Sequence, residues 1–165
     1  MACKKDQIEV LISHACLIRP MEQRDVPAVL ALEERAYDYP WTKGIFSDCL
    51  RVGYHSFVLE KNDVIVAYVL MNTVMNEAHV LNLCVAPELR RQGLARTLLE
   101  YVIDLAEKLK VVSLFLEVRE SNVVALALYQ KTGFDEIGIR RNYYPAAVGR
   151  ENAIMFVKQL DLEQM

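Results

Sequence analysis

The sequence predicts an α/β (α+β) fold, in which a mixed β-sheet carries helices on both of its faces. Its 165 residues suffice for one domain with a substantial core. The composition, with 53% hydrophobic and 25% charged residues, is ordinary for a globular protein. Stretches with strand-like and helix-like periodicity also alternate along the chain, in the order β-α-α-β-β-β-α-β-α-β-β.

In the first half, two helices follow a first strand and precede a hairpin. Asp25 can cap a helix that runs to about Ala36, and Thr42 can cap a second helix that ends near Gly53. Residues 61–63 read Lys-Asn-Asp, which suits the turn of a hairpin. Strands are expected over residues 15–19, 54–60, 64–72 and 78–85.

The second half begins with a long amphipathic helix after Gly93. Residues 111–118 form a strongly apolar strand, which is consistent with burial on both faces. Asn122 can cap a short helix that ends at Gly133. One face of the long helix carries leucines and a valine at helical spacing, namely Leu94, Leu98, Val102, Leu105 and Leu109.

Two strand–helix–strand units, at residues 80–118 and 112–140, predict locally parallel neighbours within the sheet. The last strands are expected over residues 134–141 and 154–159. The domain itself is expected to span residues 16–165. Residues 1–15 precede it as an extension that is either packed on the domain or frayed.

Charge and cysteine pattern exclude several classes of function. The net charge of −3 lacks the basic footprint of a nucleic-acid-binding protein. The cysteines form no CxxC pair and no zinc spacing with the histidines, so we expect free thiols, a reducing cytoplasm and no metal. No apolar run approaches the roughly 20 residues of a membrane helix. We expect a cytoplasmic monomer or weak homo-oligomer without a nucleic-acid or membrane partner.

Residues 90–95, Arg-Arg-Gln-Gly-Leu-Ala, form a basic turn between an apolar strand and the long helix. The first N–H groups of a helix have no partner within it and lie at its positive end, which suits a phosphate or pyrophosphate. Gly93 lets a phosphate approach the backbone closely. The turn is too short for a Walker loop and lacks the spacing of a dinucleotide fingerprint.

The spacing of this turn resembles the Arg/Gln-x-x-Gly-x-Gly/Ala loop of the GNAT superfamily of acetyl-CoA-dependent N-acetyltransferases. Further segments resemble its RimI family, bacterial enzymes that acetylate the N-terminal alanine of the eighteenth small-subunit ribosomal protein. The resemblance extends over residues 16–160. It is carried by Tyr39-Pro40-Trp41-Thr42, by Glu117-Val118-Arg119-Glu120-Ser121-Asn122, by Ala127-Leu128-Tyr129, by Gly133-Phe134 and by Arg140-Arg141-Asn142-Tyr143-Tyr144-Pro145.

The resemblance implies a GNAT fold with a mostly antiparallel sheet and a splayed parallel pair of strands at the cofactor site. It implies acetyl-CoA as cosubstrate and the N-terminal peptide of a ribosomal protein as acceptor. The pantetheine arm would bind the backbone of Leu83, Cys84 and Val85. The pyrophosphate would bind the N–H groups of Arg91, Gln92, Gly93, Leu94, Ala95 and Arg96. Asn122 could bind the cofactor, cap a helix, or do both.

Glu117 and Tyr129 are the catalytic residues that the resemblance implies. Glu117 would be the general base; it ends an apolar strand, where loss of water contacts strengthens a carboxylate as a base. The alternative is a solvated carboxylate or a partner of Arg119 or Arg140. Tyr129 would protonate the leaving thiolate, since a phenol near pKa 10 lies within about two units of a thiol near 8.5. Simple packing is the alternative.

Two other residues are rival candidates for the chemistry. Cys84 could form a covalent acetyl-enzyme, although the superfamily transfers acetyl directly. His79 could be a general base, but a structural histidine is the commoner role for such a residue.

Aromatic residues are expected to line the groove for the peptide N-terminus, since they give contact area at low entropic cost. The candidates are Tyr39, Trp41, Tyr143 and Tyr144. Trp41 could instead anchor the core at the start of the second helix. The two consecutive tyrosines are expected in a loop, with at least one facing ligand or solvent.

Two alternative functions remain open on the sequence alone. The first is a GNAT enzyme that acetylates a small amine, such as a polyamine or an aminoglycoside. The second is an acyl-CoA-binding interaction module without catalysis.

Overall fold

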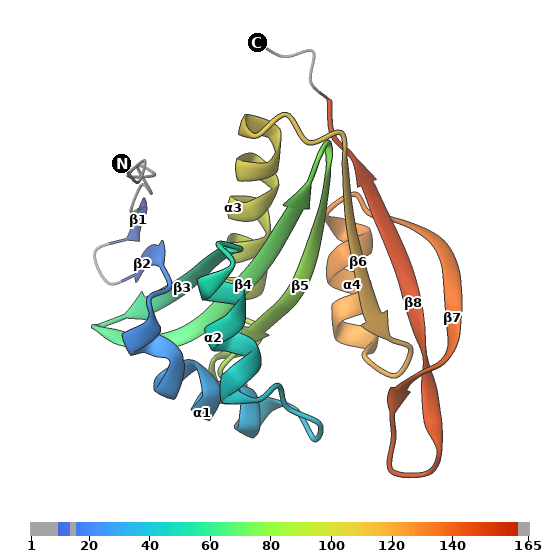
Figure 1. Cartoon of the computed structure of the whole chain (residues 1–165), viewed down its shortest axis with the longest axis horizontal. Coiled ribbons are helices and arrows are strands. Elements are labelled where there is room, and N and C mark those ends of the chain that lie inside the picture. The colour runs from blue at the N-terminus through green and yellow to red at the C-terminus, as the bar shows by residue number, and fades with distance from the viewer. Residues whose placement is uncertain (1–9, 14–15, 162–165) are drawn as a thin grey trace. The chain divides into compact units, whose positions relative to one another are not determined.

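The computed structural model describes residues 10–13 and 16–161 (Figure 1). Within these ranges the strands are β1 (Val10–Ser13), β2 (Cys16–Pro20), β3 (His55–Lys61), β4 (Val64–Val74), β5 (Glu77–Val85), β6 (Ser113–Arg119), β7 (Asp135–Pro145) and β8 (Arg150–Gln159). The helices are α1 (Val26–Ala36), α2 (Lys43–Arg51), α3 (Leu94–Lys108) and α4 (Val123–Lys131). Two 3-10 turns are η1 (Gln23–Asp25) and η2 (Pro87–Leu89).

The strands of the described residues form one mixed sheet in the order β1-β2-β3-β4-β5-β6-β8-β7. β5 and β6 are parallel, and their register runs from Glu77↔Ser113 to Val80↔Leu116. The pairs β2–β3, β6–β8 and β7–β8 are antiparallel. The predicted mixed sheet is confirmed, and so is the parallel pair of the 80–118 unit.

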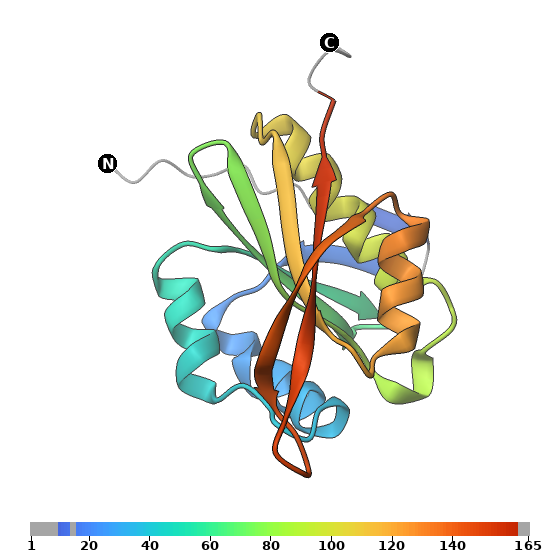
Figure 2. The ribbon, with the colours of Figure 1, turned by 90° about the vertical axis from the view of Figure 1, so that its right-hand side faces the viewer.

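The second parallel pair, predicted from the 112–140 unit, is wrong. β7 is not a neighbour of β6, because β8 lies between the two and is antiparallel to both (Figure 2). β8 returns from β7 through a short turn at Gly149, where φ is +66°. Residues 153–159 of β8 then pair with the whole length of β6, from Ser113↔Gln159 to Arg119↔Ala153. This long-range pairing, which local patterns do not reveal, decided the strand order.

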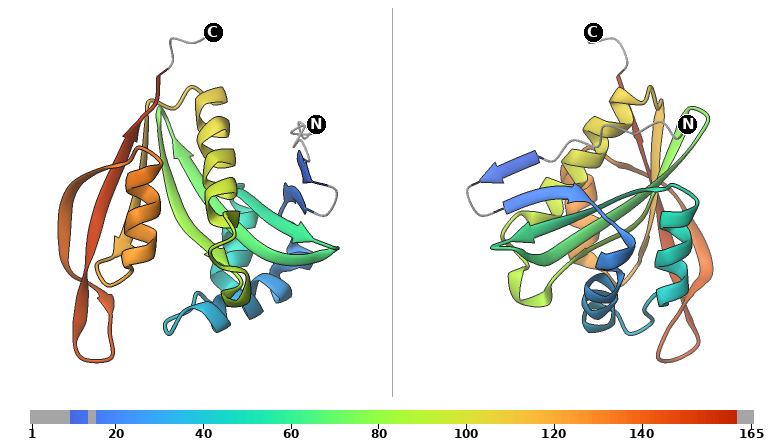
Figure 3. Two further views of the ribbon diagram at one scale, coloured as in Figure 1. Left: turned by 180° about the vertical axis from the view of Figure 1, so that it is seen from behind. Right: turned by 60° about the vertical axis from the view of Figure 1, so that its left-hand side comes forward.

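Part of the predicted N-terminal extension forms a strand. β1 pairs antiparallel with β2, with Val10 opposite Ile18 (Figure 3, right). The rest of the extension, residues 1–9 and 14–15, lies outside the described residues, so its arrangement stays a prediction.

The chain divides into two compact units, each described here by itself. The first comprises the described residues up to Leu70 together with Asn82–Leu98. Within it α1 buries Val26, Val29 and Leu32 at helical spacing, and α2 buries Phe46. Phe46 packs edge to face on Tyr68 of β4, with ring centroids 5.5 Å apart. Other buried strand residues of this unit include Ile18, Val58, Leu59 and Leu70.

The second unit comprises Met71–Leu81 and the described residues from Leu99 onward. Its core is built by β6, β8 and α4, whose buried residues include Leu114, Leu116, Val118, Tyr129, Ile154 and Phe156. In Figure 2, α4 lies beside the β7–β8 hairpin. β6 carries the Glu-Val-Arg motif and β7 the Asn-Tyr-Tyr-Pro motif, and β8 lies between these two strands.

The predicted helix ends are mostly confirmed. The Thr42 hydroxyl accepts a hydrogen bond from the Ile45 N–H at 3.3 Å, and the Asn122 side chain accepts one from the Ala125 N–H at 3.2 Å. Both are N-cap bonds. Gly53 and Gly133 follow α2 and α4 with φ of +83° and +89°, the left-handed conformation that favours glycine.

Asp25 stands at the N-cap position of α1, but the cap predicted for its side chain is wrong. The carboxylate instead accepts a hydrogen bond from the Glu22 N–H at 2.8 Å. It also accepts two from the Arg19 guanidinium, at 2.7 and 2.9 Å. Arg19 bonds to Glu60 of β3 as well. The Asp25 side chain therefore does not cap α1: it takes part in a capping box at η1 with Glu22 and pairs with the partly buried Arg19 guanidinium.

The predicted apolar face of α3 is correct only at its centre. Leu98 and Val102 are buried, whereas Leu109 is 43% exposed. Leu94 and Leu105 are only partly buried. Leu99, Ile103 and Ala106 complete the buried set instead, so the buried face is rotated from the predicted stripe.

β6 is buried on one face only, so burial on both faces was a wrong prediction. Leu114, Leu116 and Val118 are buried, and the residues between them are partly exposed. Glu117 is on the partly exposed face as a result. Tyr143 and Tyr144 also differ from the prediction, because they lie in strand β7 and not in a loop.

Candidate active site

The loop at residues 90–95 has the geometry of an anion cradle. Arg91 and Gly93 both have left-handed backbones, with φ of +63° and +80°. Alternation of this kind turns successive N–H groups toward one side. The Gly93 carbonyl accepts the first hydrogen bond of α3, from the Thr97 N–H at 3.0 Å, so the N–H groups of the first turn, which have no acceptor in a preceding turn, follow directly. A Cβ on Gly93 would meet nothing within 4 Å, so conformation, not crowding, favours glycine here.

Arginines surround this cradle. Arg90, Arg91 and Arg96 are all exposed. Their guanidinium groups add positive charge to that of the helix N-terminus. The loop thus combines left-handed backbone, a helix N-terminus and positive charge, and its assignment to a pyrophosphate stays a prediction.

The end of β5 carries the backbone predicted to bind the pantetheine arm. The register with β6 ends at Val80, and β5 continues to Val85. The Leu83 carbonyl accepts a hydrogen bond from the Tyr37 hydroxyl at 2.8 Å. Since a carbonyl has two lone pairs, it can accept a second bond.

Cys84 is poorly suited to covalent catalysis. Its thiol is 3% exposed, and burial raises its pKa to about 11. The thiol is therefore protonated at neutral pH, whereas the thiolate is the nucleophilic form. Cys16, Cys49 and Cys84 are all free, as expected; Cys3 lies outside the described residues.

Glu117 lies in a cluster with a cation and two tyrosines. Its carboxylate forms an ion pair with the Arg140 guanidinium at 2.9 Å, and its side chain is 27% exposed. It also accepts a hydrogen bond from the Tyr143 hydroxyl; burial and this carboxylate both raise the pKa of Tyr143. The rings of Tyr143 and Tyr144 are 4.9 Å apart, edge to face. The carboxylate is thus paired with a cation, partly accessible and next to two aromatic residues predicted to bind substrate.

Arg119 holds this cluster in place, a role that the sequence interpretation missed. Its guanidinium donates to the Pro145 carbonyl and to the Glu151 carboxylate, both at 2.7 Å. It also lies over the ring of Tyr144, 4.5 Å from the centroid. Its position in the Glu-Val-Arg motif, two residues beyond Glu117 and on the same face of β6, was the available signal.

Tyr129 is buried in α4, with 8% of its surface exposed. Its ring packs on Phe134 and Phe156, with centroids 5.8 and 6.1 Å away. Burial raises the pKa of its phenol to about 12. The hydroxyl is therefore protonated at neutral pH, as a general acid must be, while the ring also has the packing role named as the alternative.

Tyr39 and Trp41 differ in exposure. Tyr39 is 44% exposed, whereas the Trp41 ring packs 5.3 Å from that of the fully buried Phe46. The backbone N–H of Trp41 donates a hydrogen bond to the Glu33 carboxylate at 2.9 Å. Trp41 therefore has the core contacts of the alternative interpretation. The sequence interpretation did not single out Glu33, because its neighbour Glu34 is the same residue type.

His79 has a structural environment. Its ring stacks on Phe115 of β6, with centroids 5.2 Å apart and an angle of 22° between the planes. This contact favours the structural role over that of a general base.

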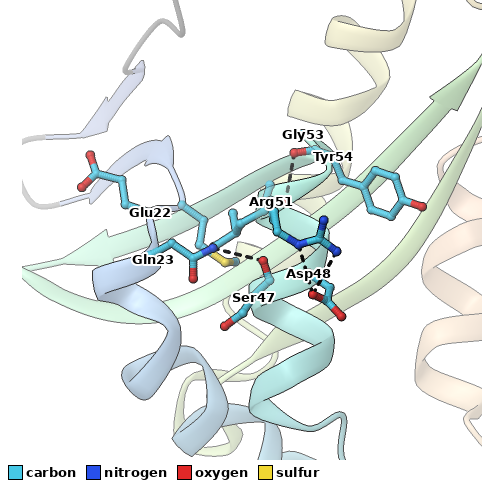
Figure 4. Close-up of a pocket in the computed structure, with 10 residues that line it drawn as sticks. Glu22, Gln23, Ser47, Asp48, Arg51, Gly53 and Tyr54 are labelled. Carbon is cyan, nitrogen blue, oxygen red and sulfur yellow. Dashed lines mark hydrogen bonds and ion pairs between the residues drawn. The ribbon is translucent and has the colours of Figure 1, made fainter.

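A pocket of about 740 Å³ lies elsewhere, beside α2 (Figure 4). Its polar groups bond to one another: the Gln23 side chain donates to the Ser47 carbonyl, and Arg51 pairs with Asp48. None of the predicted site residues lines it. It therefore contributes nothing to the candidate active site.

The described residues contain no group of three or more His, Cys, Asp or Glu side chains arranged to hold a metal ion. None of their helices combines the length and apolar composition needed to cross a membrane.

Comparison with known proteins identifies the family. Residues 19–134 match the acetyltransferase (GNAT) family. The [ribosomal protein bS18]-alanine N-acetyltransferase of Escherichia coli (strain K12) is 42% identical over 145 residues, which are 88% of this chain and 98% of that protein. A putative enzyme of the same name from Bacillus subtilis (strain 168) is 36% identical, over 85% of this chain and 93% of that one.

Solved structures of acetyltransferases are also similar to this chain. The crystal structure of the ribosomal-protein-S18-alanine N-acetyltransferase from Escherichia coli has a TM-score of 0.84 at 41% identity, covering 91% of this chain and 98% of that one. Ard1 from Thermoplasma volcanium, at 23% identity, covers 88% of this chain and 98% of that one and shares the fold with a TM-score of 0.81. The predicted fold class and the RimI resemblance are confirmed. The chain belongs to the acetyltransferase (GNAT) family.

Proposed function

We propose that this chain transfers the acetyl group of acetyl-CoA to the α-amine of the N-terminal alanine of ribosomal protein bS18. The observation that carries the proposal is the extent of the likeness to the Escherichia coli enzyme. Identity of 42% extends over 98% of that protein, so almost no part of it lacks a counterpart here. A shared fold alone would leave the acceptor open. A ribosomal substrate also agrees with the cytoplasmic location expected from the cysteines.

The donor side of the reaction uses the first unit. The N–H groups that follow Arg90 cradle the pyrophosphate, and the arginine side chains neutralise its charge. The backbone of Leu83, Cys84 and Val85 binds the pantetheine arm. A backbone N–H of this segment stabilises the oxyanion that forms when the thioester carbonyl is attacked.

The acceptor side uses Glu117. A peptide α-amine has a pKa of about 7.7–8.0, so a useful fraction is neutral at cytoplasmic pH, whereas a lysine near 10.4 is almost entirely charged. A modest base is therefore sufficient. Glu117, which is paired with Arg140, removes the amine proton directly or through a water as the C–N bond forms. The C–S bond then breaks, and the thiolate of CoA takes a proton from the Tyr129 hydroxyl.

The charges around Glu117 favour a peptide over a polyamine. Arg140 pairs with Glu117, and Arg119 lies over the neighbouring Tyr144. Since Arg119 is also paired with Glu151, these two ion pairs leave no surplus negative charge to attract a second and third ammonium group. A peptide N-terminus brings one ammonium group and can place its side chains beside Tyr143 and Tyr144.

The test measures acetylation by mass spectrometry. The purified protein is incubated with acetyl-CoA and either a peptide with the bS18 N-terminus or spermidine. Acetylation of the peptide at its α-amine, with spermidine a poor competitor, is the expected result. A strong preference for spermidine would support the small-amine alternative. CoA binding in calorimetry without acetylation of any amine would support the non-catalytic module.

Glu117→Gln tests the assignment of the base. Loss of a general base costs about 10²–10⁴-fold in turnover, while CoA affinity should stay unchanged. Glu120→Gln is the matched control, because Glu120 is an exposed carboxylate three residues further on. Wild-type turnover in Glu117→Gln would refute this role.

A further inference from the structure

Glu33 is a buried carboxylate without a role in the reaction described above. It is 2% exposed and lies on the inner face of α1. Its Oε1 atom accepts the hydrogen bond from the backbone N–H of Trp41 at 2.9 Å. Its Oε2 atom accepts one from the Asn82 side chain at 3.1 Å and another from the Tyr68 hydroxyl.

The three donors come from segments far apart in the chain. Trp41 belongs to the Tyr-Pro-Trp segment after α1, Tyr68 to β4 and Asn82 to β5. Burying a carboxylate is costly unless donors surround it, so the three donors are needed where they are. The carboxylate therefore fixes the distance between the Tyr-Pro-Trp segment and the β5 strand.

A second contact from the same end of α1 supports this arrangement. Tyr37, four residues after Glu33, donates its hydroxyl hydrogen bond to the Leu83 carbonyl. Tyr37 is the C-cap residue of α1, and its backbone N–H donates a hydrogen bond to the Glu33 carbonyl at 3.0 Å. The end of α1 thus holds two consecutive residues of β5, Asn82 and Leu83, at the start of the segment proposed to bind the pantetheine arm.

We infer that Glu33 is a positioning residue for acetyl transfer. It sets the Tyr39–Trp41 segment, which is expected from the sequence to line the acceptor groove, relative to the β5 backbone, which is proposed to bind the thioester arm. The roles given to these two segments rest on the proposed function. Acyl transfer is sensitive to such placement, since a displacement of about 1 Å can cost about 10²-fold in rate. The ring contact of Trp41 with Phe46 holds the side chain, and Glu33 holds its backbone.

Trp41 provides a readout that needs no substrate, because it is the single tryptophan of the chain. Glu33→Met removes the acceptor of all three donors while keeping side-chain length. In this variant we expect acrylamide quenching of Trp41 fluorescence to rise at least two-fold. We expect kcat on an alanine-starting peptide to fall at least ten-fold. The dissociation constant of CoA should change less than three-fold, because Glu33 bonds to no residue of the 90–95 loop.

Two further variants complete the test. Glu34→Met changes the exposed neighbour on the same helix and should match wild type in every measurement. Glu33→Gln keeps one acceptor oxygen, so it should fall between Glu33→Met and wild type in both quenching and kcat. If circular dichroism shows that Glu33→Met does not fold, Glu33→Gln carries the test, with changes of at least 1.5-fold in quenching and three-fold in kcat.

The outcomes separate this inference from the proposed function. A folded Glu33 variant with wild-type Trp41 quenching overturns the inference, whatever its turnover. A variant with lower melting temperature but wild-type kcat also overturns it, because the role would then be structural. If the wild type acetylates no peptide but Trp41 quenching rises in Glu33→Met, the positioning contact stands and the proposed function fails.

Discussion

Tyr129→Phe removes one oxygen from a buried ring and tests the proposed acid. The ring contacts with Phe134 and Phe156 are kept in this variant. Conservative changes of this kind cost less than about 1.5 kcal/mol in stability. A loss of turnover in the folded variant would therefore report on the hydroxyl and not on packing.

The size of the expected loss follows from the two acids that exchange the proton. Burial raises the pKa of Tyr129 to about 12. The pKa of a thiol in water is about 8.5, so transfer of a proton from Tyr129 to such a thiolate would be uphill by about 3.5 pKa units, or roughly 4.8 kcal/mol. Loss of water contacts weakens a thiol as an acid as it does a phenol, so the gap inside the site is smaller than this upper bound.

A proton transfer of that size is feasible, so we expect Tyr129→Phe to lose about 10²–10⁴-fold in kcat. CoA affinity should be retained. Steady-state kinetics with an alanine-starting peptide, together with thermal melting and CoA calorimetry, measure the three quantities. In the wild type, kcat should not decline through ionisation of Tyr129 between pH 7 and 10, because its pKa is about 12. Turnover within three-fold of wild type in a folded Tyr129→Phe would refute the reasoning.

Two further predictions concern stability and cofactor binding. Asp25→Asn should cost about 2–4 kcal/mol, since two charge-assisted hydrogen bonds from Arg19 are lost while that guanidinium keeps Glu60. Arg19 lowers the pKa of Asp25 from its usual 3.8. In denaturant melts, the difference in stability between wild type and Asp25→Asn should therefore persist above pH 4 and shrink as the pH falls through the lowered pKa. A difference that stays constant with pH would contradict this prediction. Gly93→Ala strains a backbone with φ of +80° by about 1–2 kcal/mol and should weaken CoA binding about 5–30-fold in calorimetry. Gly149→Ala, at φ +66°, is the control that should lose stability and keep CoA affinity; equal CoA affinity in both variants would argue against the cradle.

Local signals predicted the elements well. Thr42 and Asn122 cap helices as expected, and Gly53 and Gly133 end them. These features depend on groups within four residues of one another, which is why a sequence reveals them. Motif spacing likewise predicted the family, because the 90–95 loop is a continuous segment.

Long-range partners were beyond such reasoning. Asp25 was expected to cap a helix, but a cation six residues earlier in another element takes its carboxylate. The position of β8 between β6 and β7 also depends on pairing across a distance that no local pattern records. In both cases a strong nonlocal interaction competes with a weak local preference and wins.

The same division holds for the candidate site. The sequence by itself determined the family, the elements and the identity of Glu117 and Tyr129 as candidates for base and acid. Only the tertiary structure decided that Glu117 is paired with Arg140, and that Glu33, not its neighbour in the chain, is buried. The physical reason is that the environment of an ionisable group is set by residues brought close through folding, and those residues lie far away along the chain.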